Sequence, residues 1–199
     1  MSDAFLESFR NIISHENHLL FQPGTVVHIK ETDVAATLKL VRMGCLGCGD
    51  VVAFTLDVKN GGAHVPLSSH TSKGVSAKWN KVCDGVFVWR DTDNTLRILL
   101  CDLKSSTPTG SGWKYQLWSS SCFVKYLLEI VRRFYSELPP EPEPVFHAVA
   151  LHETPYVFGR NKRGTGLASG AGYPKSTIDH PERMVVSNGQ RLVLKAFTS

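Results

Sequence analysis

The most regular hydrophobic pattern of the chain lies between residues 81 and 128, where two short apolar segments precede a long amphipathic one. In residues 84–89, valines alternate with aromatic residues, which predicts a β-strand. Residues 96–102 are almost entirely apolar, as is typical of a strand that is buried on both faces. The polar residues 90–94 between them indicate a turn, so the two strands are predicted to pair as a hairpin.

A long amphipathic helix is predicted to follow the hairpin and to begin near Gly112. Its apolar residues recur at helical spacing and form one broad stripe: Trp113, Leu117, Phe123, Leu127, Ile130, Val131 and Phe134. The proline-rich residues 138–144 must end this helix, because proline cannot continue it. Residues 145–153 then predict a core strand, which would lie beside the strand 96–102 after a right-handed crossover.

The flanking segments predict another helix and further strands. Residues 2–14 have the pattern of an amphipathic helix that is capped by Ser2 or Asp3. Strands are predicted at 25–30, 38–43 and 51–58, and a C-terminal hairpin at 184–197 around the turn Asn188-Gly189. The whole pattern therefore predicts a mixed α/β fold.

Composition places the chain among globular proteins of one domain, residues 1–199. Of these residues, 42% are hydrophobic and 20% are charged. No apolar run is long enough to span a membrane, and the N-terminal residues lack the features of a signal peptide. Five cysteines in apolar contexts fit a reducing compartment, so we expect a cytoplasmic protein. The net charge of +4 allows a polyanionic partner without requiring one.

Two carboxylates and one ammonium group are predicted to meet at one end of the hairpin. If the two strands pair, Asp84 at the start of the first lies beside Asp102 at the end of the second. Because side chains alternate along a strand, Asp102 and Lys104 point to the same side. Two buried carboxylates repel each other, and a divalent cation removes that cost. Mg²⁺ typically binds one or two carboxylates and keeps several waters, and a neighbouring lysine could position or deprotonate a water.

These residues also carry a resemblance to a known family. Cys83-Asp84, the run Asp102-Leu103-Lys104-Ser105, and Gln116-Leu117 on the following helix resemble the PD-(D/E)xK nuclease superfamily, which has the restriction-endonuclease-like fold. The resemblance covers roughly residues 78–136. It implies an αβββαβ core, in which a mixed central sheet is flanked by helices. It also implies metal-dependent hydrolysis of phosphodiester bonds in nucleic acid, with DNA as the expected substrate of an endonuclease from a restriction or phage-defence system.

The resemblance assigns roles to particular residues. Asp84 and Asp102, with the backbone carbonyl of Leu103, would bind Mg²⁺ or Mn²⁺. Lys104 would orient or activate the attacking water, and Gln116 would assist.

In the resembled superfamily, a glutamate on the first core helix often joins the metal site. Glu7 is the candidate in the predicted helix 2–14, and Glu16 and Glu31 are alternatives for the same role.

Contacts to nucleic acid are expected from two places. Lys81 and Ser105 adjoin the predicted catalytic residues. The glycine-rich segment 159–176 is basic and includes Arg160, Lys162 and Arg163; it could clamp a phosphate backbone, or be ordered only by a partner chain. A nuclease domain of this size commonly acts as a homodimer or as a subunit of a larger complex.

Three alternatives remain open from the sequence. A second D-x-K tripeptide, Asp57-Val58-Lys59, has Asp50 upstream of it, but a Gly-Gly turn follows it in place of a helix. Cys45 and Cys48 could form half of a zinc site in a small interaction protein, with the scattered histidines His64 and His70 as the residues that could complete four ligands. The fold could also have lost its chemistry and serve as a module that binds nucleic acid or a protein partner.

Overall fold

The computed structural model describes residues 3–19, 21–22, 25–31, 33–57, 59–60, 63–64, 80–135, 137, 141–153 and 176–198. The predicted basic residues Arg160, Lys162 and Arg163 lie outside the described residues, as does His70.

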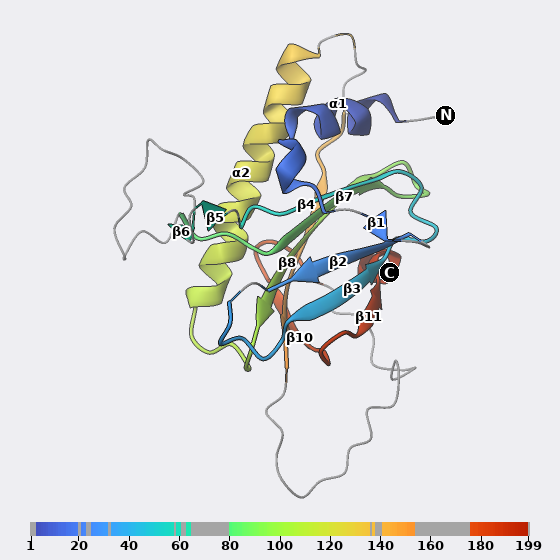
Figure 1. Ribbon diagram of the computed structural model, residues 1–199. Helices are drawn as coiled ribbons and strands as arrows, with labels where there is room; N and C mark the ends of the chain where they lie inside the picture. Colours follow the sequence, from blue (N-terminus) through green and yellow to red (C-terminus); the bar gives the residue numbers. More distant parts are fainter. Residues whose placement is uncertain are drawn as a thin grey trace, which may run out of the picture.

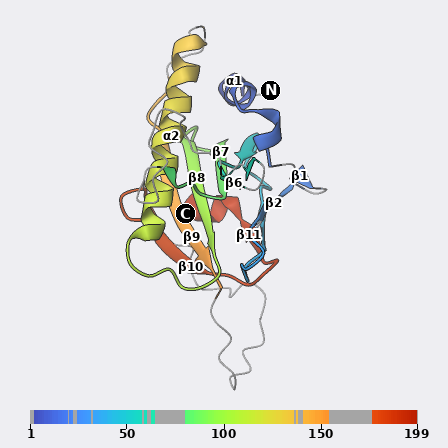
Figure 2. The same ribbon diagram turned by 60° about the vertical axis from the view of Figure 1, so that its left-hand side comes forward.

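The described residues form three layers (Figure 1, Figure 2). The helices α1 (Ala4–Ile12) and α2 (Gly112–Phe134) cover one face of a five-stranded sheet, and a four-stranded sheet covers its other face. The predicted mixed α/β class is confirmed. The two helices lie on the same side of the larger sheet, since both contribute to one hydrophobic cluster, and the cluster on the other side is shared with the second sheet.

The five-stranded sheet has the order β10 (Glu182–Val185), β9 (Val145–His152), β8 (Leu96–Lys104), β7 (Gly85–Arg90) and β4 (Val51–Phe54). Strands β4, β7 and β8 pair antiparallel, whereas β8, β9 and β10 pair parallel. Strand β8 is buried because alternate side chains enter the helix-side cluster and the cluster between the sheets. Along the chain, the two helices and the strands of the five-stranded sheet follow one another as α1, β4, β7, β8, α2, β9 and β10.

The four-stranded sheet has the order β1 (Phe21–Gln22), β2 (Val26–Lys30), β3 (Leu40–Gly44) and β11 (Arg191–Val193). A short hairpin is formed by β5 (Lys59–Asn60) and β6 (Ala63–His64), and 3₁₀ helices occupy His15–Asn17 and Leu194–Thr198.

Helix α1 begins where the sequence predicts. Oδ1 of Asp3 accepts hydrogen bonds from the backbone amides of Phe5 and Leu6, at 3.0 and 3.2 Å. These are two of the amides that a helix start leaves without a partner. The cap is itself held by Arg90 at the end of β7, whose Nε lies 2.5 Å from Asp3 Oδ2.

The predicted C-terminal hairpin is wrong. The turn forms, with Gly189 at a φ of 75°, but β10 pairs with β9 of the larger sheet and β11 pairs with β3 of the smaller one. Oδ1 of Asn188 accepts hydrogen bonds from the amides of Lys39 and Leu40, so the turn is bound to the smaller sheet. Residues 182–193 therefore connect the two sheets. The residues of the turn are the same in a hairpin and in such a connection, so the sequence of the turn cannot distinguish the two.

Within the part of the chain that the structure describes, the helices are too short or too polar to cross a membrane.

Candidate functional site

Asp84 and Asp102 face each other at one end of the β7–β8 hairpin. Gly85 is paired with Cys101, and the antiparallel register therefore puts Asp84 opposite Asp102. Oδ2 of Asp84 accepts a hydrogen bond of 2.5 Å from the backbone amide of Leu103. The hairpin backbone itself thus positions this carboxylate.

Asp102 is fully buried and faces the helix layer. Ile98 and Leu100, which precede it at alternate positions of β8, both belong to the helix-side cluster. Oδ2 of Asp102 lies 2.7 Å from Nζ of Lys104. Oδ1 of Asp102 is buried and accepts no hydrogen bond from the described residues. A buried carboxylate oxygen without a donor is costly unless a proton or a cation is bound there.

Helix α2 holds the ammonium group of Lys104. Nζ of Lys104 donates to Oε1 of Gln116 at 2.7 Å, and Nε2 of Gln116 donates to the carbonyl of Val82 at 3.2 Å. A second bond joins the same two segments, because the amide of Cys83 donates to Oγ of Ser120 at 2.9 Å. Gln116 therefore connects the end of β8 with the chain just before Asp84.

Burial is the main cause that raises the pKa values of both carboxyl groups. The pKa of Asp84 is raised well above its ordinary value, first by burial and then by the charge of Asp102, and the Leu103 amide opposes this. Burial raises the pKa of Asp102 to about 6, against the opposing effect of Lys104. Protonated Asp84 can donate a hydrogen bond to Asp102, which also lowers the pKa of Asp102. In the absence of a cation, the pair therefore retains a proton at a pH where isolated aspartates have none.

Glu31 is the third carboxylate whose charge acts on this pair. It follows β2 directly, and its negative charge raises the pKa of both Asp84 and Asp102. Its Oε1 accepts a hydrogen bond from the amide of Asp33 at 2.7 Å.

The structure separates Glu7 from this cluster. Glu7 is exposed on α1, whose cap Asp3 is bonded to Arg90. Arg90 is the last residue of β7, and Asp84 directly precedes the first. Helix α1 therefore begins at the end of β7 that is farther from Asp84, and the strand spans roughly 20 Å. Of the acids that the sequence suggests, Glu31 is therefore the one near the pair. Glu16 is exposed in the 3₁₀ helix after α1.

The remaining predicted residues of the described part lie around the cluster. Lys81 is exposed three residues before Asp84. The side chain of Leu103 is buried between the sheets, as expected from its alternate position. Oγ of Ser105 accepts a hydrogen bond from the amide of Thr37 at 2.9 Å, and the Ser105 carbonyl accepts one from the Thr37 hydroxyl at 3.0 Å.

Sequence reasoning missed His152. It ends β9, directly beside Lys104 in the parallel β8–β9 register, and it is buried. Its Nδ1 lies 3.4 Å from Oγ1 of Thr107, in the loop that leads from β8 to α2. The sequence did contain a signal for this position, because His152 lies near the end of the predicted strand 145–153, which was expected beside the strand 96–102.

The donor set of the cluster fits a hard divalent cation. No group of three His, Cys, Asp or Glu side chains among the described residues is arranged to hold a metal ion. Mg²⁺ is commonly bound through one or two carboxylates, with water and substrate phosphates as its other ligands. The two facing carboxylates, one of which has a buried oxygen without a donor, meet this requirement.

The structure gives less support to the two alternative sites, the second D-x-K tripeptide and the cysteine pair. Asp50 is paired with Arg10 at 2.6 Å, and Val58 of the second D-x-K lies outside the described residues. Cys45 and Cys48 are both buried next to the cluster between the sheets. Burial raises the pKa of Cys45 to about 12, which opposes the thiolate form that zinc requires.

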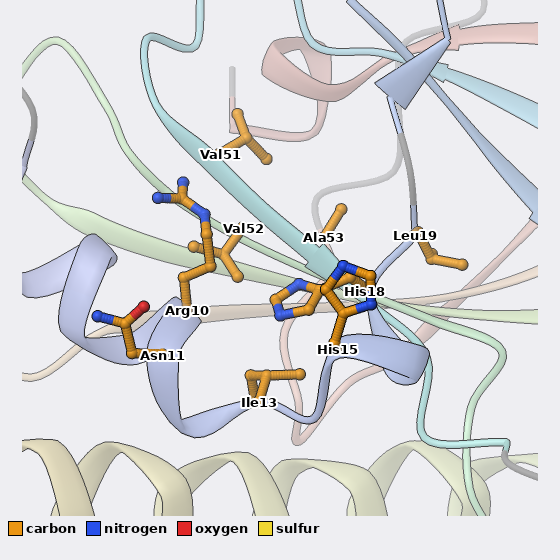
Figure 3. Close-up of a pocket in the computed structure, with 9 residues that line it drawn as sticks. All are labelled: Arg10, Asn11, Ile13, His15, His18, Leu19, Val51, Val52 and Ala53. Atoms are coloured by element: carbon orange, nitrogen blue, oxygen red, sulfur yellow. The ribbon is translucent and has the colours of Figure 1, made fainter.

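A separate pocket of about 430 Å³ opens beside α1 and β4 (Figure 3). The rings of His15 and His18 lie edge to face there, with their centres 6.5 Å apart. Its lining includes Arg10 and the strand residues Val51–Ala53, and none of the lining residues belongs to the carboxylate cluster. This concavity is therefore distinct from the site around Asp84.

Comparison with known proteins finds no similar family: no protein-family model, no curated protein and no solved structure matches this chain.

Proposed function

We propose that the protein is a metal-dependent nuclease that hydrolyses phosphodiester bonds in nucleic acid. The observation that carries this proposal is the juxtaposition of Asp84, Asp102 and Lys104 at one end of the β7–β8 hairpin. Fully buried Asp102 contributes nothing to the apolar core, and an apolar residue at its place would cost less. A buried carboxylate beside a second carboxylate is the arrangement that metal-dependent phosphoryl chemistry uses.

The order of the layer supports the proposal. Helix α1 is followed by three antiparallel strands, by α2, and by β9 parallel to β8. The resemblance in sequence implies an αβββαβ core of this kind, with the D-x-K tripeptide on the third strand. The four-stranded sheet on the far face would then be an addition to that core.

Asp84 and Asp102 would hold Mg²⁺ or Mn²⁺, and the bound cation would supply Lewis-acid stabilisation of charge on the phosphate. The Leu103 amide keeps Asp84 oriented, as its 2.5 Å hydrogen bond shows. Lys104 is held from two sides by Asp102 and Gln116, and a quarter of its side chain remains exposed. Its ammonium group can therefore donate to an attacking water or to a phosphate oxygen without moving.

The deciding experiment is a calorimetric titration of Mn²⁺ into the wild-type protein and into Asp102→Asn, followed by cleavage assays on the same samples. Plasmid DNA, single-stranded DNA and RNA serve as substrates. Asp179→Asn is the matched control, because Asp179 is exposed near the C-terminal strands. We expect Asp102→Asn to lose both metal binding and cleavage, while the control retains both.

Wild-type protein that binds no Mn²⁺, even with nucleic acid present, would exclude a metal-dependent nuclease. Metal binding without cleavage of any substrate would instead support the module that has lost its chemistry.

A further inference from the structure

The outer face of the four-stranded sheet carries a row of basic side chains. His28 of β2, Arg42 of β3 and Arg191 of β11 are direct neighbours in the register, because Arg42 is paired with both other residues. Residues on either side of Arg42 in β3 are buried against the larger sheet, so Arg42 points outward. Arg42 and Arg191 are exposed, and His28 is partly exposed. We call these three residues the basic row.

The basic row is not neutralised within the described structure. Strands β2, β3 and β11 contain no aspartate or glutamate. The ion pairs formed by the described residues do not involve Arg42, Arg191 or Lys30. Lys30 extends the positive charge by two positions along β2, and it is exposed. Like charges directly opposite each other weaken a sheet, so the charges of Arg42 and Arg191 do not favour the pairing of β3 with β11.

The end of β2 connects the basic row with the carboxylate cluster. Ile29 points inward between the outward-facing His28 and Lys30, and it packs on Gly85, the residue after Asp84. Glu31, the next residue after Lys30, acts on the charges of Asp84 and Asp102. Asp102 faces the helix layer, on the far side of the larger sheet from the basic row, so a chain bound on the row would reach the cluster by passing around the end of β2.

We propose that the basic row, extended by Lys30, binds the phosphate backbone of a nucleic acid and leads it to the carboxylate cluster. Neighbouring strands are about 4.8 Å apart, so the row presents its side chains over about 10 Å, enough for successive phosphates of one strand. The choice of nucleic acid as the polyanion rests on the proposed function, whereas the row of basic side chains without ion-pair partners among the described residues does not. Such contacts give affinity without reading the base sequence.

The test measures binding without catalysis. Fluorescence anisotropy of labelled single-stranded and duplex oligonucleotides is followed at several salt concentrations, in EDTA, for wild type, Arg42→Ala and Arg42→Glu. Arg133→Glu is the matched control, because Arg133 is exposed on α2 and its change of charge is the same. Loss of one phosphate contact is expected to reduce the salt slope by about 0.9 for a duplex or 0.7 for a single strand. At 0.1 M salt this corresponds to roughly eightfold or fivefold weaker binding for Arg42→Ala, respectively.

The result that supports the proposal is a weaker and less salt-dependent affinity for both Arg42 variants, with Arg133→Glu close to wild type. Equal affinities for Arg42→Glu and Arg133→Glu would overturn it. So would binding of phosphatidylserine vesicles that depends on Arg42 while oligonucleotides do not bind. Because EDTA removes any bound metal ion, this assay measures binding whether or not the protein cleaves nucleic acid. Failure of cleavage can thereby be separated from failure of the basic row.

Discussion

Nζ of Lys104 lies 2.7 Å from Oε1 of Gln116, so the last residue of β8 is bonded to the second turn of α2. The same ammonium group lies 2.7 Å from Asp102. Helix α2 and strand β8 thus both contact the ammonium group of Lys104. This group holds α2 against the end of the hairpin where Asp84 is also found. The proposed chemistry and the packing of α2 on the sheet consequently depend on the same side chain.

Replacing Lys104 with methionine should abolish cleavage and also destabilise the protein. The change leaves buried Asp102 without its cation, and we expect a loss of about 2–4 kcal/mol in the free energy of unfolding at pH 7.5. The loss should be smaller at pH 5, because Lys104 lowers the pKa of Asp102 and its removal favours the protonated carboxyl group. Urea denaturation at both pH values measures this. The exposed Lys81 provides the control, Lys81→Met, and equal stability of the two variants would contradict the expectation.

Asp102→Asn should reduce the pH dependence of stability, with the contribution of Asp84, whose pKa is also raised by burial, remaining. The pKa of Asp102 rises from 3.8 to about 6 on folding, so the folded state binds the proton more tightly than the unfolded state. The free energy of unfolding of the wild type without metal therefore falls as the pH rises from about 4 to 6, by on the order of 2–3 kcal/mol. Denaturation in EDTA across this range should show the fall in wild type and in Asp179→Asn. An unchanged fall in Asp102→Asn would rule out the raised pKa.

Gln116→Ala should lower the rate of cleavage and leave metal affinity nearly unchanged. Gln116 is bonded to Lys104 but to neither carboxylate, so its removal frees the ammonium group without changing the donors for the cation. A residue that orients a catalytic group in this way typically contributes 10–100-fold, and we expect about that loss in kcat with little change in KM. Single-turnover kinetics and Mn²⁺ titration separate the two effects. Gln190→Ala, in the turn before β11, is the control; a loss of metal affinity in Gln116→Ala would contradict the assignment.

Arg90→Met should destabilise the fold without a direct effect on the site. Arg90 is paired with the α1 cap Asp3 at 2.5 Å and with Glu141, ahead of β9, at 2.8 Å. Loss of this partly buried network is expected to cost about 2–4 kcal/mol. Thermal unfolding measures it, with the exposed Arg133→Met as control. Metal affinity of the folded variant at low temperature should equal that of the wild type, since Arg90 lies at the other end of β7 from Asp84.

Local patterns in the sequence are sufficient for the hairpin, for α2, and for the facing of Asp84 and Asp102. Strand alternation and a short turn act between near neighbours, so they fix which side chains meet at the hairpin end. The same reasoning predicts the parallel pairing of β9 with β8, because a helix of the length of α2 connects them. The roles predicted for the D-x-K tripeptide and for Gln116 came from the resemblance in sequence to a nuclease superfamily.

Other parts of the site depend on contacts between distant segments. The sequence predicts Glu7 as the third acid and offers Glu31 only as an alternative. The packing of β2 on Gly85 brings Glu31 near the pair, whereas α1 begins at the opposite end of β7. The position of His152 beside Lys104 likewise follows from the register of β8 and β9. The basic row unites residues that are 14 and 149 positions apart, through pairings that join β2, β3 and β11.

The sequence alone therefore determined the mixed α/β class, the hairpin and the predicted pairing of two carboxylates with a lysine. The tertiary structure decided that the turn at Asn188-Gly189 crosses between two sheets, that Glu31 is the third nearby acid, and that basic side chains of three strands form one row. The physical reason is the distance along the chain over which each kind of interaction acts. Alternation and helical spacing act within a few residues, whereas the burial of two sheet faces against each other selects which distant strands become neighbours.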